Sequence, residues 1–159
     1  VRYVEYLEKN VNLNIEDICY TTNNSREHHR VRAAIITDST EDLIQKLKGF
    51  TFKTHLASNT YFGIHNKVKD SVVSKKMGEL SQEDIDLLSK SGNMLILKST
   101  ESTRKTQLIR IAQIYTRGAN LEWEALYSLT NVKKISLPTY EFQKLRCWPS
   151  FSQSGKILT

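Results

Sequence analysis

The residues best suited to chemistry in this chain are four histidines, at positions 28, 29, 55 and 65. His28 and His29 are adjacent, so their side chains point in different directions on a strand or a helix. No cysteine or carboxylate stands beside them at the spacing of a metal site. We therefore expect His28, His29 and the neighbouring Arg26 and Arg30 to be structural, with hydrogen bonds to backbone or carboxylate groups.

Nucleophilic catalysis has no better support. The sequence contains no G-x-S-x-G motif, and its six glycines are dispersed at positions typical of helix ends and turns. Cys19 lies on the apolar face of a predicted helix and Cys147 lies in an aromatic segment, and neither setting favours a thiolate. Asp84 and Asp86 flank an apolar position on a predicted helix, which is typical of a solvated face. The chain is predicted to be non-catalytic, without a cofactor or a metal.

Composition limits the possible partners. The 159 residues suffice for one domain with a core, and the net charge of +6 with pI near 9.3 would suit an acidic partner. The basic residues are spread along the chain without a binding motif, so nucleic-acid binding is a remote alternative. No apolar run approaches 18 residues and there is no signal peptide, so we expect a cytoplasmic protein without membrane contact. Because the sequence starts inside a predicted helix, we expect a piece of a longer protein.

The first fifty residues predict two helices, a strand and a third helix. Val4 and Leu7 share a helical face in residues 1–10, and Asn14 is a suitable N-cap for a second helix that fades at residues 21–24. Residues 26–37 predict a strand that becomes buried on both faces. Ser39 and Asp42 then cap a helix that ends at Gly49.

The later elements are predicted from similar signals. Residues 61–64 predict a second strand, residues 68–80 a helix, and Ser81 with Asp84 caps another helix that ends near Gly92. Residues 94–97 fit either a helical turn or a strand. Residues 105–117 are the clearest helix, stopped by Gly118, and a short segment follows with Trp123 and Leu126 pointing inward. Residues 133–137 predict a strand that should complete the sheet begun at 30–37.

These elements predict a single domain (1–159) of the α/β (α+β) class, in which helices pack a small sheet of about three strands. Pro138 should end the last strand, because proline donates no hydrogen bond. The tail (residues 138–159) then carries Tyr140, Phe142 and Trp148 within a short distance. Large aromatic rings so close together favour an extended strap that buries them against a surface.

Both ends of the chain resemble parts of modular polyketide synthases. Residues 15–21 and 25–34 are similar to the linker that follows a ketosynthase. Gly118, Trp123, Leu126 and Tyr127 are similar to a segment that follows the acyltransferase. Leu137-Pro138-Thr139-Tyr140, with Phe142, Arg146 and Trp148, resembles the strap that comes next, although Glu141 and Cys147 replace the usual proline and tyrosine.

The resemblance has one informative gap. Only about sixty residues separate the two blocks, far fewer than an acyltransferase domain needs. The resemblance therefore implies the trans-acyltransferase class of synthases and the flanking subdomain, or acyltransferase docking domain, beside a ketosynthase. In that family the domain is a small sheet of about three strands packed by helices.

The resemblance implies a non-catalytic docking and scaffold module. Its partners would be the ketosynthase domain of the same chain, a freestanding acyltransferase and the acyl carrier protein. The alternatives are a structural spacer between domains or an element of lateral contact between ketosynthases. The candidate contact residues are Tyr140, Phe142, Arg146 and Trp148 in the tail, and Lys67, Lys69, Lys75 and Lys76 in the middle of the chain.

Overall fold

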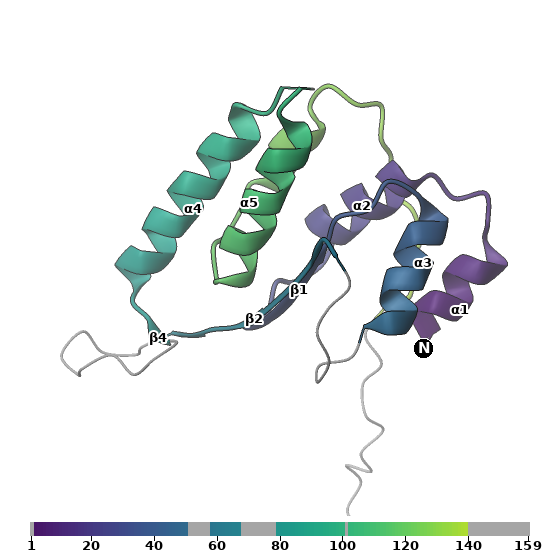
Figure 1. The fold of residues 1–159 in the computed structure, drawn as a ribbon, viewed down its shortest axis with the longest axis horizontal. Helices are drawn as coiled ribbons and strands as arrows, with labels where there is room; N and C mark the ends of the chain where they lie inside the picture. The colour runs from purple at the N-terminus through teal and green to yellow at the C-terminus, as the bar shows by residue number, and fades with distance from the viewer. Residues whose placement is uncertain (1, 51–57, 68–78, 101, 140–159) are drawn as a thin grey trace, which may run out of the picture.

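A computed structural model describes residues 2–50, 58–67, 79–100 and 102–139, and it has the expected mixed α and β architecture (Figure 1). In chain order the elements are α1 (Arg2–Lys9), α2 (Ile15–Asn24), β1 (Val31–Ile35), α3 (Thr40–Gly49), β2 (Thr60–Ile64), β3 (Asn66–Lys67), β4 (Glu79–Leu80), α4 (Gln82–Leu97), α5 (Arg104–Thr116) and the 3-10 helix η1 (Trp123–Tyr127).

Local capping signals place the helix starts correctly. The Asn14 side chain accepts a hydrogen bond from the Glu16 amide (2.8 Å) at the start of α2. Ser39 caps α3 by accepting from the amide of Asp42, and Ser81 forms a reciprocal capping box at the start of α4. These side chains satisfy amides that the first helical turn leaves free, which is why short sequence patterns suffice to find them.

The main sheet consists of β1 and β2, which pair antiparallel with Arg32 opposite Gly63. Asn59 forms the turn before β2 with φ of 63°, a conformation that asparagine tolerates. The end of α5 lies against β2 so closely that a Cβ at Gly63 would stand 2.0 Å from the Thr116 carbonyl oxygen. Only glycine allows this approach of helix and strand.

Two strand predictions are corrected. In β1, Arg32 is buried (4% exposed), whereas Val31 and Ala33 are exposed, so the strand is not covered on both faces. Residues 133–137 form no strand, and the described residues hold only two strands in the main sheet. The reason is that this segment pairs with side chains of α2, as shown below.

The middle of the chain also differs from expectation. Gly92 does not end α4, which continues to Leu97 and includes residues 94–97 as helix. Gly92 instead leaves room for Leu121, whose Cδ2 would stand 2.4 Å from a Cβ at that position. Leu80 lies in β4 and not in a helix. The rest of that predicted helix, residues 68–78, lies outside the described residues.

The described residues form two hydrophobic cores; α1 and α3 lie to one side of β1 and β2, and α4 and α5 lie to the other (Figure 1). The first gathers Leu7, Ile18, Leu43 and Leu137, from α1, α2, α3 and the segment before the tail. The second gathers Ile96, Ile111 and Trp123, from α4, α5 and η1. We call these the first and the second core.

Candidate functional site

The segment that leads into the tail is held along α2 by side chains. The Lys133 amide donates to Asp17 Oδ1 (2.9 Å), and the Ile135 amide donates to Thr21 Oγ1 (2.9 Å). Asp17 and Thr21 are one helical turn apart, a rise of about 6 Å, which is close to the spacing of about 6.6 Å between alternate residues of an extended chain. Side chains of α2 therefore accept the backbone hydrogen bonds that a neighbouring strand would otherwise accept.

The carbonyl groups of this segment are held as well. Tyr6 Oη donates to the Ser136 carbonyl (2.7 Å), and Arg26 Nη2 donates to the carbonyls of Leu137 (2.9 Å) and Pro138 (3.1 Å). The Leu137 side chain is buried in the first core. We call residues 133–138 the anchor segment. Its contacts fix the position of the chain up to Pro138.

The sequence did not lead us to expect these α2 contacts. A signal was available, because Asp17 and Thr21 are polar, stand four residues apart and flank the apolar Ile18 on one face. A buried polar pair needs hydrogen-bond partners, and an extended chain supplies them.

The predicted contact residues themselves mostly lie outside the described part of the chain. Tyr140, Phe142, Arg146 and Trp148 fall there, as do Lys69, Lys75 and Lys76. Lys67 lies in β3. The structure therefore positions the base of the tail and leaves these contacts as predictions.

Arg32 joins β1 to the end of α5. Its guanidinium donates to the carbonyls of His29 (2.9 Å), Tyr115 (3.3 Å) and Ala119, and to Asn120 Oδ1 (3.1 Å). It also lies 4.9 Å from the centre of the Tyr115 ring. The last carbonyls of a helix carry partial negative charge, so they attract a cation; the Tyr115 carbonyl also accepts from the Gly118 amide (3.0 Å). Burial lowers the pKa of Arg32.

His28 connects three elements and is structural, as expected. A carbonyl can only accept, so Nε2 donates to the Asn23 carbonyl (2.9 Å), and Nδ1 of the neutral ring accepts from Tyr115 Oη (2.7 Å). The ring also lies against Trp123 of η1, with ring centres 6.2 Å apart. Burial lowers the pKa of His28, and the charge of Arg32 adds to this effect.

The described residues were compared with the arrangements that bind metal ions or activate a thiol. No group of three or more histidine, cysteine or acidic side chains there could hold a metal ion. Burial, with a contribution from Glu16, raises the pKa of the Cys19 thiol to about 11, so it is protonated at neutral pH. In the part of the chain that the structure covers, no helix has the length and apolar character to cross a membrane.

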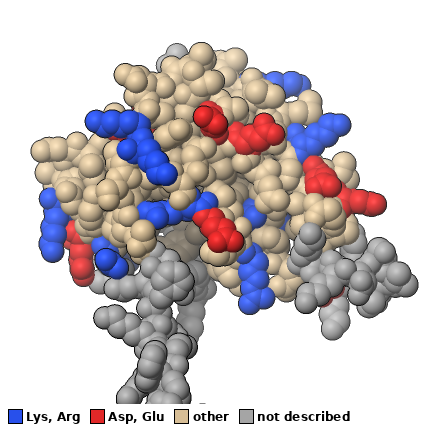
Figure 2. Space-filling view, turned by 180° about the vertical axis from the view of Figure 1, so that it is seen from behind, with Lys and Arg blue, Asp and Glu red and all other residues tan. Residues whose placement is uncertain are grey.

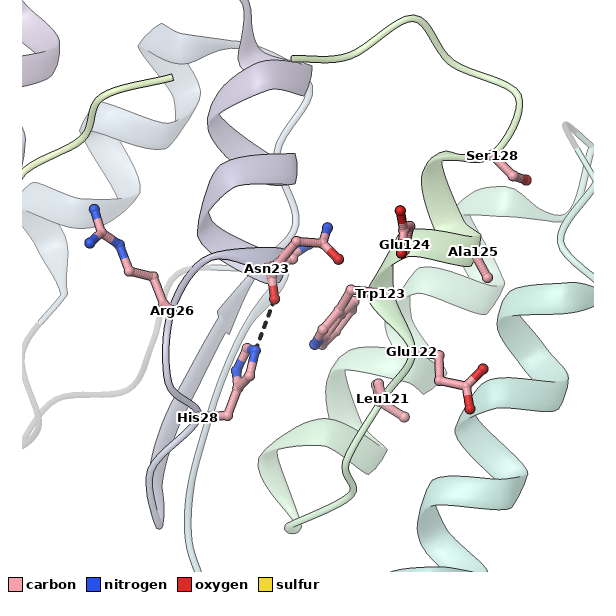
Figure 3. A pocket seen from close by; sticks show the side chains of 10 residues that line it. Asn23, Arg26, His28, Leu121, Glu122, Trp123, Glu124, Ala125 and Ser128 are labelled. Carbon is pink, nitrogen blue, oxygen red and sulfur yellow. Dashed lines mark hydrogen bonds between the residues drawn. The ribbon is translucent and has the colours of Figure 1, made fainter. Parts of the chain in front are cut away.

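An open hollow of about 810 Å³ separates the end of α2 from η1. Asn23 and His28 lie on the α2 side, and Trp123, Glu122 and Glu124 lie on the η1 side (Figure 3). Charged residues elsewhere are scattered: on the face seen in Figure 2, lysine and arginine alternate with acidic side chains over a mostly uncharged surface. That face shows no continuous basic patch of the kind that binds nucleic acid.

Comparison with known proteins shows similarity to polyketide synthases. Residues 1–47 match the family model described as CurL-like, PKS C-terminal. The chain is 30% identical over 97% of its length to the polyketide synthase PksR of Bacillus subtilis, and 27% identical over 94% of its length to PksM of the same organism. It spans only 6% of PksR and 3% of PksM.

A solved structure shares the fold. It is the ketosynthase from module 6 of the bacillaene synthase from Bacillus subtilis 168, with a TM-score of 0.61 and 21% sequence identity. The match covers 92% of this chain and 23% of that chain.

Proposed function

We propose that this chain is a non-catalytic docking and scaffold module beside a ketosynthase in a trans-acyltransferase polyketide synthase. In this role it positions a freestanding acyltransferase and the acyl carrier protein relative to the ketosynthase. The observation that carries the proposal is the fold similarity of nearly the whole chain to one part of a longer ketosynthase chain. Similarity to two polyketide synthases over at least 94% of the chain agrees with it.

The anchor segment supports a role for the tail in contact with the ketosynthase. Five hydrogen bonds, donated by Tyr6 and Arg26 or accepted by Asp17 and Thr21, hold the chain up to Pro138. Tyr140, Phe142, Arg146 and Trp148 follow directly and would bury their side chains against the ketosynthase.

Hydrogen exchange tests this contact. Residues 145–148 should exchange rapidly in the isolated chain and become protected when the ketosynthase is attached. Replacing Phe142 and Trp148 by alanine should remove that protection, whereas Phe151→Ala, outside the resemblance, should not. Strong protection of residues 145–148 in the isolated chain would contradict the proposal.

The lysines of the middle segment are proposed to contact an acidic surface of the acyltransferase. Charge reversal of Lys67, Lys69, Lys75 and Lys76 should weaken its binding to the ketosynthase-attached protein, most strongly at low salt. Reversal of Lys98 at the end of α4 is the control and should have little effect. No saturable binding of the acyltransferase at low salt would reject this part of the proposal.

One observation favours lateral contact between ketosynthases as a second function. Leu87, Met94 and Leu97 on α4 are 66%, 47% and 75% exposed. Their spacing of seven and three residues is that of a helix that packs on another helix. Replacing Leu87 and Leu97 by glutamate should reduce self-association of the ketosynthase-attached protein in sedimentation, and Val11→Glu, on an exposed loop, should not. Equal self-association of all variants would exclude this function.

A further inference from the structure

The hollow between α2 and η1 contains a polar group without a partner. Trp123 is only 9% exposed and lines the hollow, and its Nε1–H has no hydrogen bond among the described residues. In Figure 3 the nitrogen end of the indole points across the gap toward the side of His28. A buried donor left unpaired costs about 1–3 kcal/mol, so it needs an explanation.

The polar side chains around this indole have hydrogen-bond partners, so the unpaired Trp123 Nε1–H stands apart from its neighbours. Both ring nitrogens of His28 are hydrogen bonded, and Asn23 Nδ2 donates to Tyr127 Oη (2.7 Å). The Tyr115 hydroxyl is bonded to His28, and its ring centre lies 5.2 Å from that of Trp123. The indole is therefore held in place by a complete network while its own donor lacks an acceptor.

The rim of the hollow carries unbalanced negative charge. Glu122 and Glu124 are exposed on the η1 side, and neither forms an ion pair within the described residues. The backbone of this rim is fixed, because the Glu122 amide donates to Asn93 Oδ1 (2.9 Å). The one cation that lines the hollow, among the residues described, is Arg26, and its guanidinium already donates to the anchor segment.

We propose that this hollow binds an extended, basic peptide segment of a partner protein. A backbone carbonyl of the segment accepts a hydrogen bond from Trp123 Nε1–H, and separate basic side chains of the segment pair with Glu124 and Glu122, whose carboxylates point in different directions (Figure 3). The evidence for this occupant is charge complementarity: two carboxylates and one guanidinium line the hollow, so its described lining is acidic on balance, although the chain as a whole carries +6. Phosphate-bearing ligands would be repelled by the same carboxylates.

This inference goes beyond the proposed function, because it needs neither the tail nor the lysines of the middle segment. It assigns a second contact surface that attracts partners of the opposite charge. An acidic acyltransferase surface and a basic peptide would therefore bind to different, oppositely charged surfaces of the same module and would not compete.

The two tryptophans give a direct test. In a 1H–15N spectrum of the full 159-residue chain, the two indole N–H signals can be assigned with Trp148→Phe. Titration with the capped peptide Ala-Lys-Ala-Arg-Ala should shift the Trp123 indole signal downfield in a saturable manner. The capped peptide Ala-Glu-Ala-Glu-Ala should leave that signal unchanged.

Matched variants test the rim. Glu122→Gln with Glu124→Gln should weaken the binding of the basic peptide about fivefold, as expected for exposed ion pairs. Glu5→Gln with Glu83→Gln removes the same charge from α1 and α4 and should leave the affinity unchanged. The proposal is overturned if the Trp123 signal does not move, if both peptides shift it equally, or if the two double variants bind alike. Circular dichroism confirms that each variant is folded.

Discussion

The strongest test of the fold is the replacement of Arg32 by methionine. The side chain is 4% exposed and donates four hydrogen bonds, three of which join β1 to the end of α5 and the residues that follow it. A hydrogen bond to a charged group contributes about 1.5–3 kcal/mol, and removing the cation also recovers the cost of its burial. We therefore expect the free energy of unfolding to fall by about 2–4 kcal/mol, a large share of a typical total of about 5–15 kcal/mol.

Urea denaturation in a Trp148→Phe background measures this loss, because fluorescence then reports Trp123 in the second core and circular dichroism reports all helices. Arg30→Met is the matched control, since Arg30 is exposed and its contact with Asn66 is long, at 3.4 Å. It should change stability by less than about 0.5 kcal/mol. Arg32→Lys, which keeps the charge, should lie between the two. If Arg32→Met unfolds at the same urea concentration as Arg30→Met, the guanidinium does not hold the two cores together.

Three further predictions follow from single contacts. Thr21→Val removes the acceptor for the Ile135 amide, so stability should fall by about 1–2 kcal/mol and that amide should exchange faster; unchanged exchange would contradict the anchor. Gly63→Ala should lower the free energy of unfolding by about 1–3 kcal/mol, because the added Cβ would clash with α5. Gly49→Ala is the control and should be neutral or stabilising, because a Cβ there meets open space. Equal melting temperatures of the two variants would refute the close approach of α5 and β2. The pKa of His28 lies below its usual 6.5 in the folded state, so the unfolded chain takes up the proton first, and stability should decline as pH falls below about 6.5. His28→Gln should reduce that decline, as measured by urea denaturation between about pH 5 and pH 7.5.

The features that the sequence predicts well depend on neighbouring residues. Ser39 and Ser81 predict helix starts because the backbone amides that they cap lie within one helical turn of them. The strand at 60–64 and the helix at 104–116 agree with predictions based on turn residues and periodicity. Each of these signals is complete within about ten residues of chain.

The features that the sequence predicts wrongly depend on residues far away in the chain. Arg32 is buried because the end of α5, more than eighty residues later, brings the Tyr115 carbonyl to it. Residues 133–137 have strand character, but their partners are side chains of α2 and not a strand. Gly92 looks like a helix end, although it serves the packing of Leu121. Periodicity within a segment cannot show which element will lie beside it.

The two cores explain how a chain of this size can hold separate surfaces in one fixed arrangement. The family model covers residues 1–47, which supply most of the first core, and Leu137 completes that core from the far end of the chain. The second core, with α4, α5 and η1, lies between these two pieces of sequence. Since Arg32 and His28 hold the two cores together, the base of the tail and the exposed face of α4 keep a defined relation. A partner that contacted both surfaces would meet them at a fixed separation. Loss of the Arg32 contacts should therefore weaken the binding of such a partner, even where the residues of each surface are unchanged.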